Sequence, residues 1–177
     1  MTLTAVHPPR LVEELGELAV RMSAALLGDD KGDSAVQILT SLSLNAVPNA
    51  SGAGVTLVGP RGALTSDSAT SEIVREADAP QHHLNQGPCL DAVRQVAPVH
   101  VANLRVDRRW PEWSKAVRPL NIASLISIPL VSSGCVRGTM KVYCDLPGSF
   151  EERSTYVLGE LAQTIARLLK PASPLSD

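Results

Sequence analysis

Apolar residues recur at helical spacing near both ends of this chain. Between residues 10 and 27 they follow alternating steps of four and three, as Leu11, Leu15, Leu18 and Met22. Between residues 152 and 169 the same steps are taken by Leu158, Leu161, Ile165 and Leu168. Such spacing places the apolar side chains on one face of a helix. The pattern therefore predicts a first and a last helix, each with one face available for packing.

Strands are indicated between these helices. A second helix over 33–46 comes first, and short apolar runs at 54–58 and 63–66 then flank Gly59-Pro60-Arg61-Gly62, which predicts a hairpin. The clearest strands cover 123–130 and 135–144. In the second of these, Met140 and Val142 alternate with Thr139, Lys141 and Tyr143, so one face of the sheet is apolar and the other amphipathic.

The middle of the chain is more irregular. Residues 68–86 are polar and weakly periodic, with one or two helical turns over 72–77, and are the best candidate for a mobile lid. Short helices over 89–95 and 110–117 flank a brief strand at 98–101, and Ser149 with Glu152 has the spacing of a capping box for the last helix.

This order predicts an α+β fold. We expect an antiparallel sheet of about five to six strands with helices on both faces and the first and last helices packed together. Residues 10–170 form a single domain in this interpretation, residues 1–9 a flexible N-terminus and residues 171–177 a disordered tail.

Composition narrows the function classes. The net charge is −2 and basic residues alternate with acidic ones, which argues against direct nucleic-acid binding. Neither a secretory signal nor a stretch of about 18 apolar residues is present, so we expect a soluble cytoplasmic protein without a membrane span. Three cysteines, Cys89, Cys135 and Cys144, lack disulfide or zinc spacing and fit free thiols.

Four short segments occur in a characteristic order along the chain: Gly87-Pro88-Cys89-Leu90-Asp91-Ala92, Asp107-Arg108-Arg109-Trp110-Pro111, Ser127-Ile128-Pro129-Leu130 and Gly148-Ser149-Phe150-Glu151. Together they resemble the GAF domains of actinobacterial regulators, many of which are followed by an RNA-binding ANTAR domain. The resemblance covers roughly residues 50–169. Since the chain ends before an ANTAR domain could begin, an RNA role would need a partner chain.

The resemblance implies a fold, a role and a site. GAF domains are small cytoplasmic sensory modules that bind a small molecule or hold two subunits together, so we expect a regulator and not an enzyme. The ligand of a GAF domain lies between the sheet and the middle helices. On this sequence that region maps to Cys89, Trp110, Trp113, Ser127, Thr139 and Tyr143. An error of one residue in strand register would move half of them to the other face.

Several of these residues have a second interpretation. Cys89 begins a helix, where the positive end of the dipole would favour a reactive thiolate, but a small buried core residue is the commoner case. Five basic residues surround Trp110 and Trp113 and form either a surface for an anion or partner, or a solvated helix face with inward tryptophans: Arg105, Arg108, Arg109, Lys115 and Arg118. Haem ligation by His82 or His83 is a weaker interpretation than that of a solvated histidine in a loop.

Two functional hypotheses follow from the sequence. One is a ligand-binding sensor that signals to a regulatory protein partner, and the other is a ligand-free module that forms a homodimer through the apolar seams of the first and last helices. A thiol-based redox sensor and a GAF-type methionine sulfoxide reductase are weaker alternatives, because the cysteine context of that reductase is absent. Neither the cyclic-nucleotide signature of phosphodiesterases nor a bilin-attachment site is recognisable, no metal site is expected, and the ligand or cofactor stays unknown.

Overall fold

Five strands form one antiparallel sheet in the computed structural model, which describes residues 31–59, 62 and 64–169. The strand order is β2-β1-β5-β4-β3, so the chain's last and longest strand lies at the centre. The strands are β1 (Gly52–Val58), β2 (Leu64–Ala69), β3 (Val99–Val101), β4 (Ser124–Ser132) and β5 (Cys135–Cys144). The expected hairpin is present as β1 and β2.

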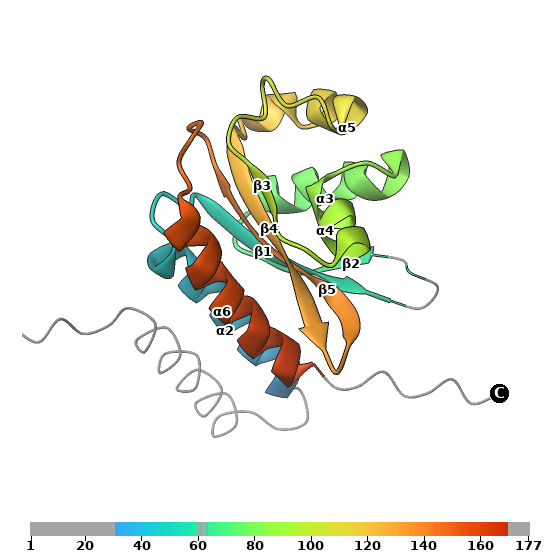
Figure 1. Cartoon of the computed structure of the whole chain (residues 1–177), viewed down its shortest axis with the longest axis vertical. Helices are drawn as coiled ribbons and strands as arrows, with labels where there is room; N and C mark the ends of the chain where they lie inside the picture. The colour runs from blue at the N-terminus through green and yellow to red at the C-terminus, as the bar shows by residue number, and fades with distance from the viewer. Residues whose placement is uncertain (1–30, 60–61, 63, 170–177) are drawn as a thin grey trace, which may run out of the picture.

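Helices cover both faces of this sheet (Figure 1). The described helices are α2 (Lys31–Ala46), α3 (Glu72–Leu84), α4 (Pro88–Gln95), α5 (Pro111–Ala116), the 3-10 turn η2 (Arg118–Leu120) and α6 (Glu152–Leu168). Figure 1 shows α2 and α6 side by side on one face and α3, α4 and α5 on the other. The expected α+β architecture is therefore confirmed, with five strands in the described part of the chain.

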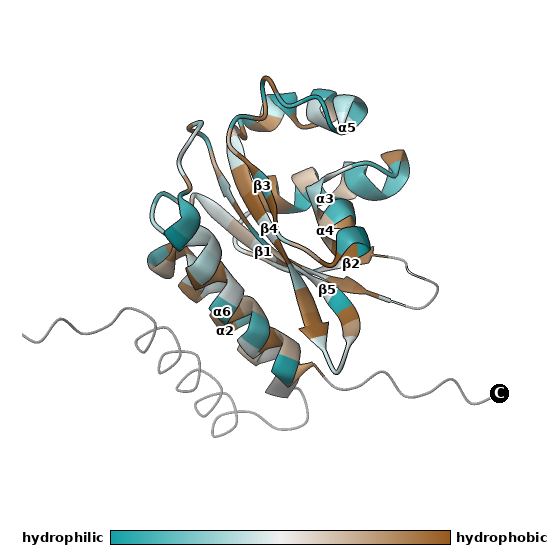
Figure 2. Cartoon of the chain, viewed as in Figure 1, coloured by the Kyte–Doolittle hydropathy of each residue, from teal (hydrophilic) through white to brown (hydrophobic). Residues whose placement is uncertain are grey.

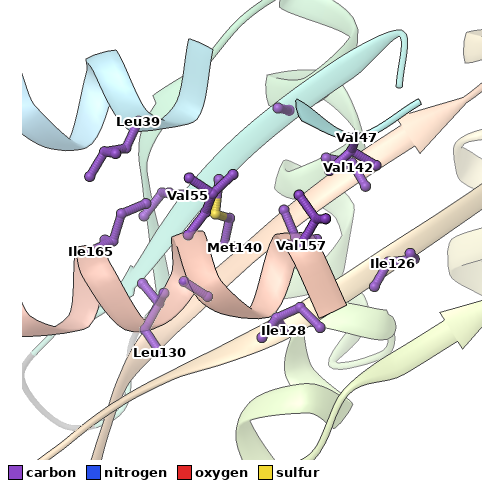
Figure 3. Packing of buried hydrophobic residues seen from close by; sticks show 14 of the residues in the cluster. Leu39, Val47, Val55, Ile126, Ile128, Leu130, Met140, Val142, Val157 and Ile165 are labelled. Carbon is purple, nitrogen blue, oxygen red and sulfur yellow. The ribbon is translucent and has the colours of Figure 1, made fainter. Parts of the chain in front are cut away.

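The face under α2 and α6 carries the larger apolar core. Inward side chains of the three central strands, among them Val55, Ile128 and Met140, contact Leu39 of α2 and Ile165 of α6. Figure 3 shows these side chains meeting between the sheet and α6. Aliphatic side chains fill most of this layer, in keeping with the low aromatic content of the chain. Hydropathy on the ribbon follows the same division, with α6 brown on one side and teal on the other (Figure 2).

The seam residues of the last helix belong to this core. Leu158, Leu161 and Ile165 are 0–2% exposed, and Leu168 packs partly buried against them. These four residues therefore lack the free surface that the predicted dimer seam needs, since they already pack within their own chain. Their partners in the first predicted helix, Leu11, Leu15, Leu18 and Met22, lie outside the described residues, as do both chain ends. Homodimerisation itself stays a prediction.

Two local predictions need correction. Residues 72–84 form a helix of 13 residues, α3, which continues through Pro80, whereas one or two turns over 72–77 were expected. Its apolar face is short, so periodicity alone underestimated it. The mobility expected of this segment stays a prediction. The capping box is also absent, because Ser149 Oγ donates a hydrogen bond to the Leu146 carbonyl and no side chain caps α6. No helix in the described ranges is long and apolar enough to cross a membrane.

Candidate functional site

A buried ion pair lies between the sheet and α3. Lys141 of β5 approaches Asp78 of α3 with 2.5 Å between Nζ and Oδ2, and the two side chains are 0% and 2% exposed. Lys141 also donates to the hydroxyl of Thr56 on β1, and Thr56 donates to Asp78 at 3.2 Å. An ion pair that is buried away from solvent is stable only when further hydrogen bonds satisfy both charges. The Thr56 hydroxyl provides such hydrogen bonds to both Lys141 and Asp78.

Sequence explains how a lysine reaches this position. Lys141 faces α3 because β5 alternates strictly, and it is paired with Gly54 on β1 and with Ser127 on β4. A Cβ added at Gly54 would lie 2.9 Å from the Lys141 Cε atom and 2.7 Å from Val74. The glycine thus makes room for the aliphatic part of the lysine under α3.

Tyr143 extends the same face towards α4. Its hydroxyl lies 3.4 Å from Asp78 Oδ1 and interacts with the Cys89 side chain. Complete burial, followed by the neighbouring Asp78 and Cys89, raises the pKa of Tyr143 well above its ordinary value. The phenol therefore stays protonated and acts as a hydrogen-bond donor in this environment.

Two further hydroxyls on this face have no partner. Ser127 Oγ and Thr139 Oγ1 are buried and make no hydrogen bond with any described residue. Thr139 is paired with Thr56 across β1 and β5, and Ser127 is paired with Lys141 across β4 and β5, so both adjoin the ion pair. We refer to Thr56, Asp78, Ser127, Thr139, Lys141 and Tyr143 as the polar cluster. Its unpaired hydroxyls are unusual, because buried polar groups are nearly always hydrogen-bonded.

The turn into α4 closes one end of the polar cluster. Gln81 Oε1 accepts a hydrogen bond of 2.9 Å from the backbone N–H of Cys89. Gly87, two residues before Cys89, has a φ of 144°, and a Cβ at this position would overlap the Gln81 side chain. Pro88 occupies the first helical position, as expected. The Gly-Pro-Cys segment therefore serves to bring α4 and the Cys89 thiol against α3.

The two tryptophans are part of the core on this face. Trp110 and Trp113 are 3% and 0% exposed and meet edge to face at 6.1 Å. Trp113 donates to the Ala77 carbonyl of α3 at 3.0 Å, and Trp110 donates to Asp91 at 2.9 Å. They are consequently not surface anchors for a partner, and their inward packing is confirmed, which leaves the role of the surrounding basic residues open. They connect α5 rigidly to α3 and α4.

All six candidate pocket residues lie on the side of the sheet that α3, α4 and α5 cover. Cys89, Trp110, Trp113 and Tyr143 are buried there, and Ser127 and Thr139 contribute to the polar cluster. Asp78, Lys141, Thr56 and Gln81 were not among the candidate site residues that the sequence predicted. The sequence did contain one signal for this site, because Lys141 alternates in step with Thr139 and Tyr143 on a strand whose other face is apolar. That the six residues bind a ligand is still a prediction.

No group of three or more histidine, cysteine or acidic residues converges in the described part of the chain. His82 lies half-buried in the last turn of α3, where burial chiefly lowers its pKa, while Asp78 raises it and Lys141 lowers it. The three cysteines are free: Cys89 and Cys144 are buried and Cys135 is exposed. Cys144 belongs to the opposite core, so it does not face Cys89.

Proteins of known structure share this architecture. A type II free methionine-R-sulfoxide reductase from Thermoplasma acidophilum is 20% identical, with a TM-score of 0.66 over 77% of this chain and 91% of that chain. A free methionine-R-sulfoxide reductase from Neisseria meningitidis, in complex with its substrate, is 17% identical, with a TM-score of 0.67 over 95% and 93%. The GAF domain of a phosphoenolpyruvate-protein phosphotransferase from Coxiella burnetii is 12% identical, with a TM-score of 0.65 over 90% and 92%.

The expectation that this protein is not an enzyme is contradicted by these neighbours. Two of the three are reductases with the same fold over most of their length, so the fold does not separate regulators from catalysts. At 12–20% identity the similarity establishes the fold alone. No curated protein matches the sequence. The model of the GAF domain family, in its GAF_2 form, matches residues 9–170, and the chain therefore belongs to the GAF domain family.

Proposed function

We propose that this GAF domain is a cytoplasmic sensory protein that binds a small polar molecule between its sheet and α3. The supporting observation is the pair of buried hydroxyls, Ser127 Oγ and Thr139 Oγ1, that adjoin an ion pair and have no partner among the described residues. Leaving such groups unpaired is unfavourable by about 1–3 kcal/mol each. A ligand that hydrogen-bonds to them would recover that free energy on binding.

The ion pair indicates which ligands fit. A ligand that enters between Lys141 and Asp78 separates two buried charges, and an unpaired buried charge is strongly unfavourable. A molecule with both an anionic and a cationic group replaces each lost partner. We therefore propose a small zwitterion, with a carboxylate that binds Lys141 and an ammonium group that binds Asp78. Free amino acids and their sulfoxides are the simplest members of this class.

Entry would require α3 to move, because its own side chains fill the site. This helix buries few large apolar groups, since its buried residues are Val74, Ala77, Asp78 and Gln81. Pro80 lies inside it and cannot donate the backbone hydrogen bond of that turn. The hydrogen bond from Trp113 to Ala77 would carry a displacement of α3 into α5. We propose that this movement is the signal, read by a protein partner or a second subunit.

Isothermal titration calorimetry with free amino acids and free methionine sulfoxide tests this proposal. The informative variant is Ser127→Ala with Thr139→Val, which removes the two unpaired hydroxyls. Without ligand it should be as stable as the wild type or more stable, because it loses unsatisfied polar groups. With ligand its affinity should fall about tenfold or more. A matched control, Ser41→Ala with Thr65→Val, removes two exposed hydroxyls and should leave the affinity unchanged. Equal affinity in both variants would refute the site.

A second candidate function is reduction of a free sulfoxide, the activity named for two of the structural neighbours. The observation that favours it is the free Cys89 thiol, which the hydrogen bond from the Cys89 N–H to Gln81 holds at the end of the polar cluster. Attack of this thiol on a sulfoxide would give the sulfide and a cysteine sulfenic acid, which an added dithiol would reduce with release of water. Methionine formation from the R-sulfoxide with dithiothreitol, lost in Cys89→Ser but retained in Cys135→Ser, would establish the activity. Ligand binding without methionine formation would rule out the reductase activity and support the sensory function.

A further inference from the structure

A groove separate from the polar cluster lies at one end of the molecule. It is bounded by the loop after β3 on one side and by α5 and η2 on the other, with a volume of about 530 Å³. Its floor is apolar, with buried Leu104 and Ile122. Four cationic side chains line it: Arg105, Arg108, Lys115 and Arg118. We call this feature the basic groove.

The positive charge of the basic groove is not compensated within the described chain. None of its four cations forms an ion pair or a side-chain hydrogen bond with a described residue. The one acid in the lining, Asp107, is already engaged by Arg109, with 2.6 Å between Oδ2 and Nη2. That hydrogen bonding chiefly lowers the pKa of Asp107, although partial burial opposes it. The carboxylate therefore stays ionised, and its charge is balanced by Arg109 and not by the four cations of the groove.

The walls of the basic groove are fixed by the structure beneath them. Trp110 and Trp113 anchor α5 in the core, and Arg109 stacks on the Trp110 ring at 4.3 Å. The opposite wall is held by the Leu104 N–H, which donates to the Ala123 carbonyl at 2.8 Å. Ser114 lines the groove with a buried hydroxyl that has no partner among the described residues. The backbone that carries the four cations is thus held in place, which lowers the ordering cost of binding a ligand.

We infer that the basic groove binds a small polyanion of the phosphate class. Four uncompensated cations and an unpaired hydroxyl suit an anion with several acceptor oxygens, and arginine binds phosphate oxygens in a bidentate manner. A volume of about 530 Å³ lies within the range of small-molecule sites and holds a molecule with two or three phosphate groups. The apolar floor can also contact an attached organic group. This site is independent of the zwitterion proposed for the polar cluster.

Inorganic triphosphate is the probe for a direct test, because it carries the charge and no other chemistry. Calorimetry at 150 mM and 50 mM NaCl should show one site per chain in the wild type, tighter at low salt because exposed charges are screened. Arg108→Ala with Arg118→Ala should weaken binding about tenfold or more. The control Arg75→Ala with Arg153→Ala removes the same charge from exposed positions on α3 and α6 and should change affinity less than twofold.

Three results would overturn the inference. Equal weakening by both double variants would mean that triphosphate senses only the net charge. A dissociation constant above about 1 mM at 150 mM NaCl would mean that the groove is not a site for small anions. Tighter binding of hexaglutamate than of triphosphate, lost in the groove variant, would assign the groove to an acidic segment of a partner protein. Circular dichroism of both variants verifies folding, which these exposed substitutions should preserve.

Discussion

Replacing Asp78 by Asn tests the buried ion pair most sharply. The substitution keeps the shape of the side chain and removes its charge, while Lys141 stays in place with 0% of its side chain exposed. Among the described residues, the ammonium group then keeps the Thr56 hydroxyl and a neutral amide as partners. Removing one member of a buried pair is destabilising by about 3–5 kcal/mol. We expect this loss in the free energy of unfolding of Asp78→Asn.

Urea denaturation measures this loss, and the slope with denaturant should stay unchanged if only stability is affected. For a domain of this size the same loss lowers Tm by about 6–20 °C. Lys141→Met should cause a smaller loss of stability, because the Asp78 carboxylate still accepts hydrogen bonds from the hydroxyls of Thr56 and Tyr143. The double variant should lose less stability than the sum of the two single losses, because the two charges interact with each other.

An exposed ion pair provides the control. Arg75 and Glu72 lie 3.2 Å apart on α3 with side chains 55% and 70% exposed. Glu72→Gln should change stability by less than about 0.5 kcal/mol, because exposed pairs contribute little. A loss below about 1 kcal/mol for Asp78→Asn, close to that of the control, would refute the reasoning, since it would show that water reaches Lys141 and that the face is not sealed.

Three further predictions concern the same fold. Gly138→Ala should destabilise by about 1–3 kcal/mol in urea, because its Cβ would overlap the Thr56 carbonyl oxygen, whereas Gly159→Ala in α6 meets nothing and should stabilise by about 0.5–1 kcal/mol; the reverse order would contradict the register. In the variant Tyr156→Phe, Tyr143 is the tyrosine that remains, and its tyrosinate absorbance should appear only when the protein unfolds in alkali. The raised pKa of Tyr143 contributes stability below pH 10 that is lost as the pH rises further. Ionisation of Tyr143 in the folded protein would contradict this prediction. The lowered pKa of His82 means that stability declines as pH falls below about 6.5, and His82→Asn should remove that part of the decline in urea titrations at several pH values.

The sequence predicted the sheet well because alternation is a local property. The period of two along β5 correctly placed Thr139 and Tyr143 on the face opposite Met140, and the resemblance to GAF domains identified which face the middle helices cover. Apolar spacing likewise located α6. Its leucines were assigned to a dimer seam because a helical pattern shows that a face is buried without showing what buries it.

The polar cluster could not be read in the same way. Asp78 and Lys141 are 63 residues apart, and each is ordinary in its own segment. A lysine on a strand is usually at the surface, so its burial becomes visible only when α3 is placed over it. The polar composition of α3 predicted only one or two helical turns in a possible lid, yet that polarity is what supplies Asp78 and Gln81 to the interior. Tertiary pairing decided this region.

Native mass spectrometry of the protein purified gently from its own cells tests the central claim most directly. If a small polar molecule occupies the polar cluster, the wild type carries a discrete extra mass that is lost on denaturation, and the variant with Ser127→Ala and Thr139→Val carries much less of it. A wild-type protein without any extra mass, which also gives no heat with free amino acids or their sulfoxides, would contradict the proposal that this GAF domain senses such a ligand.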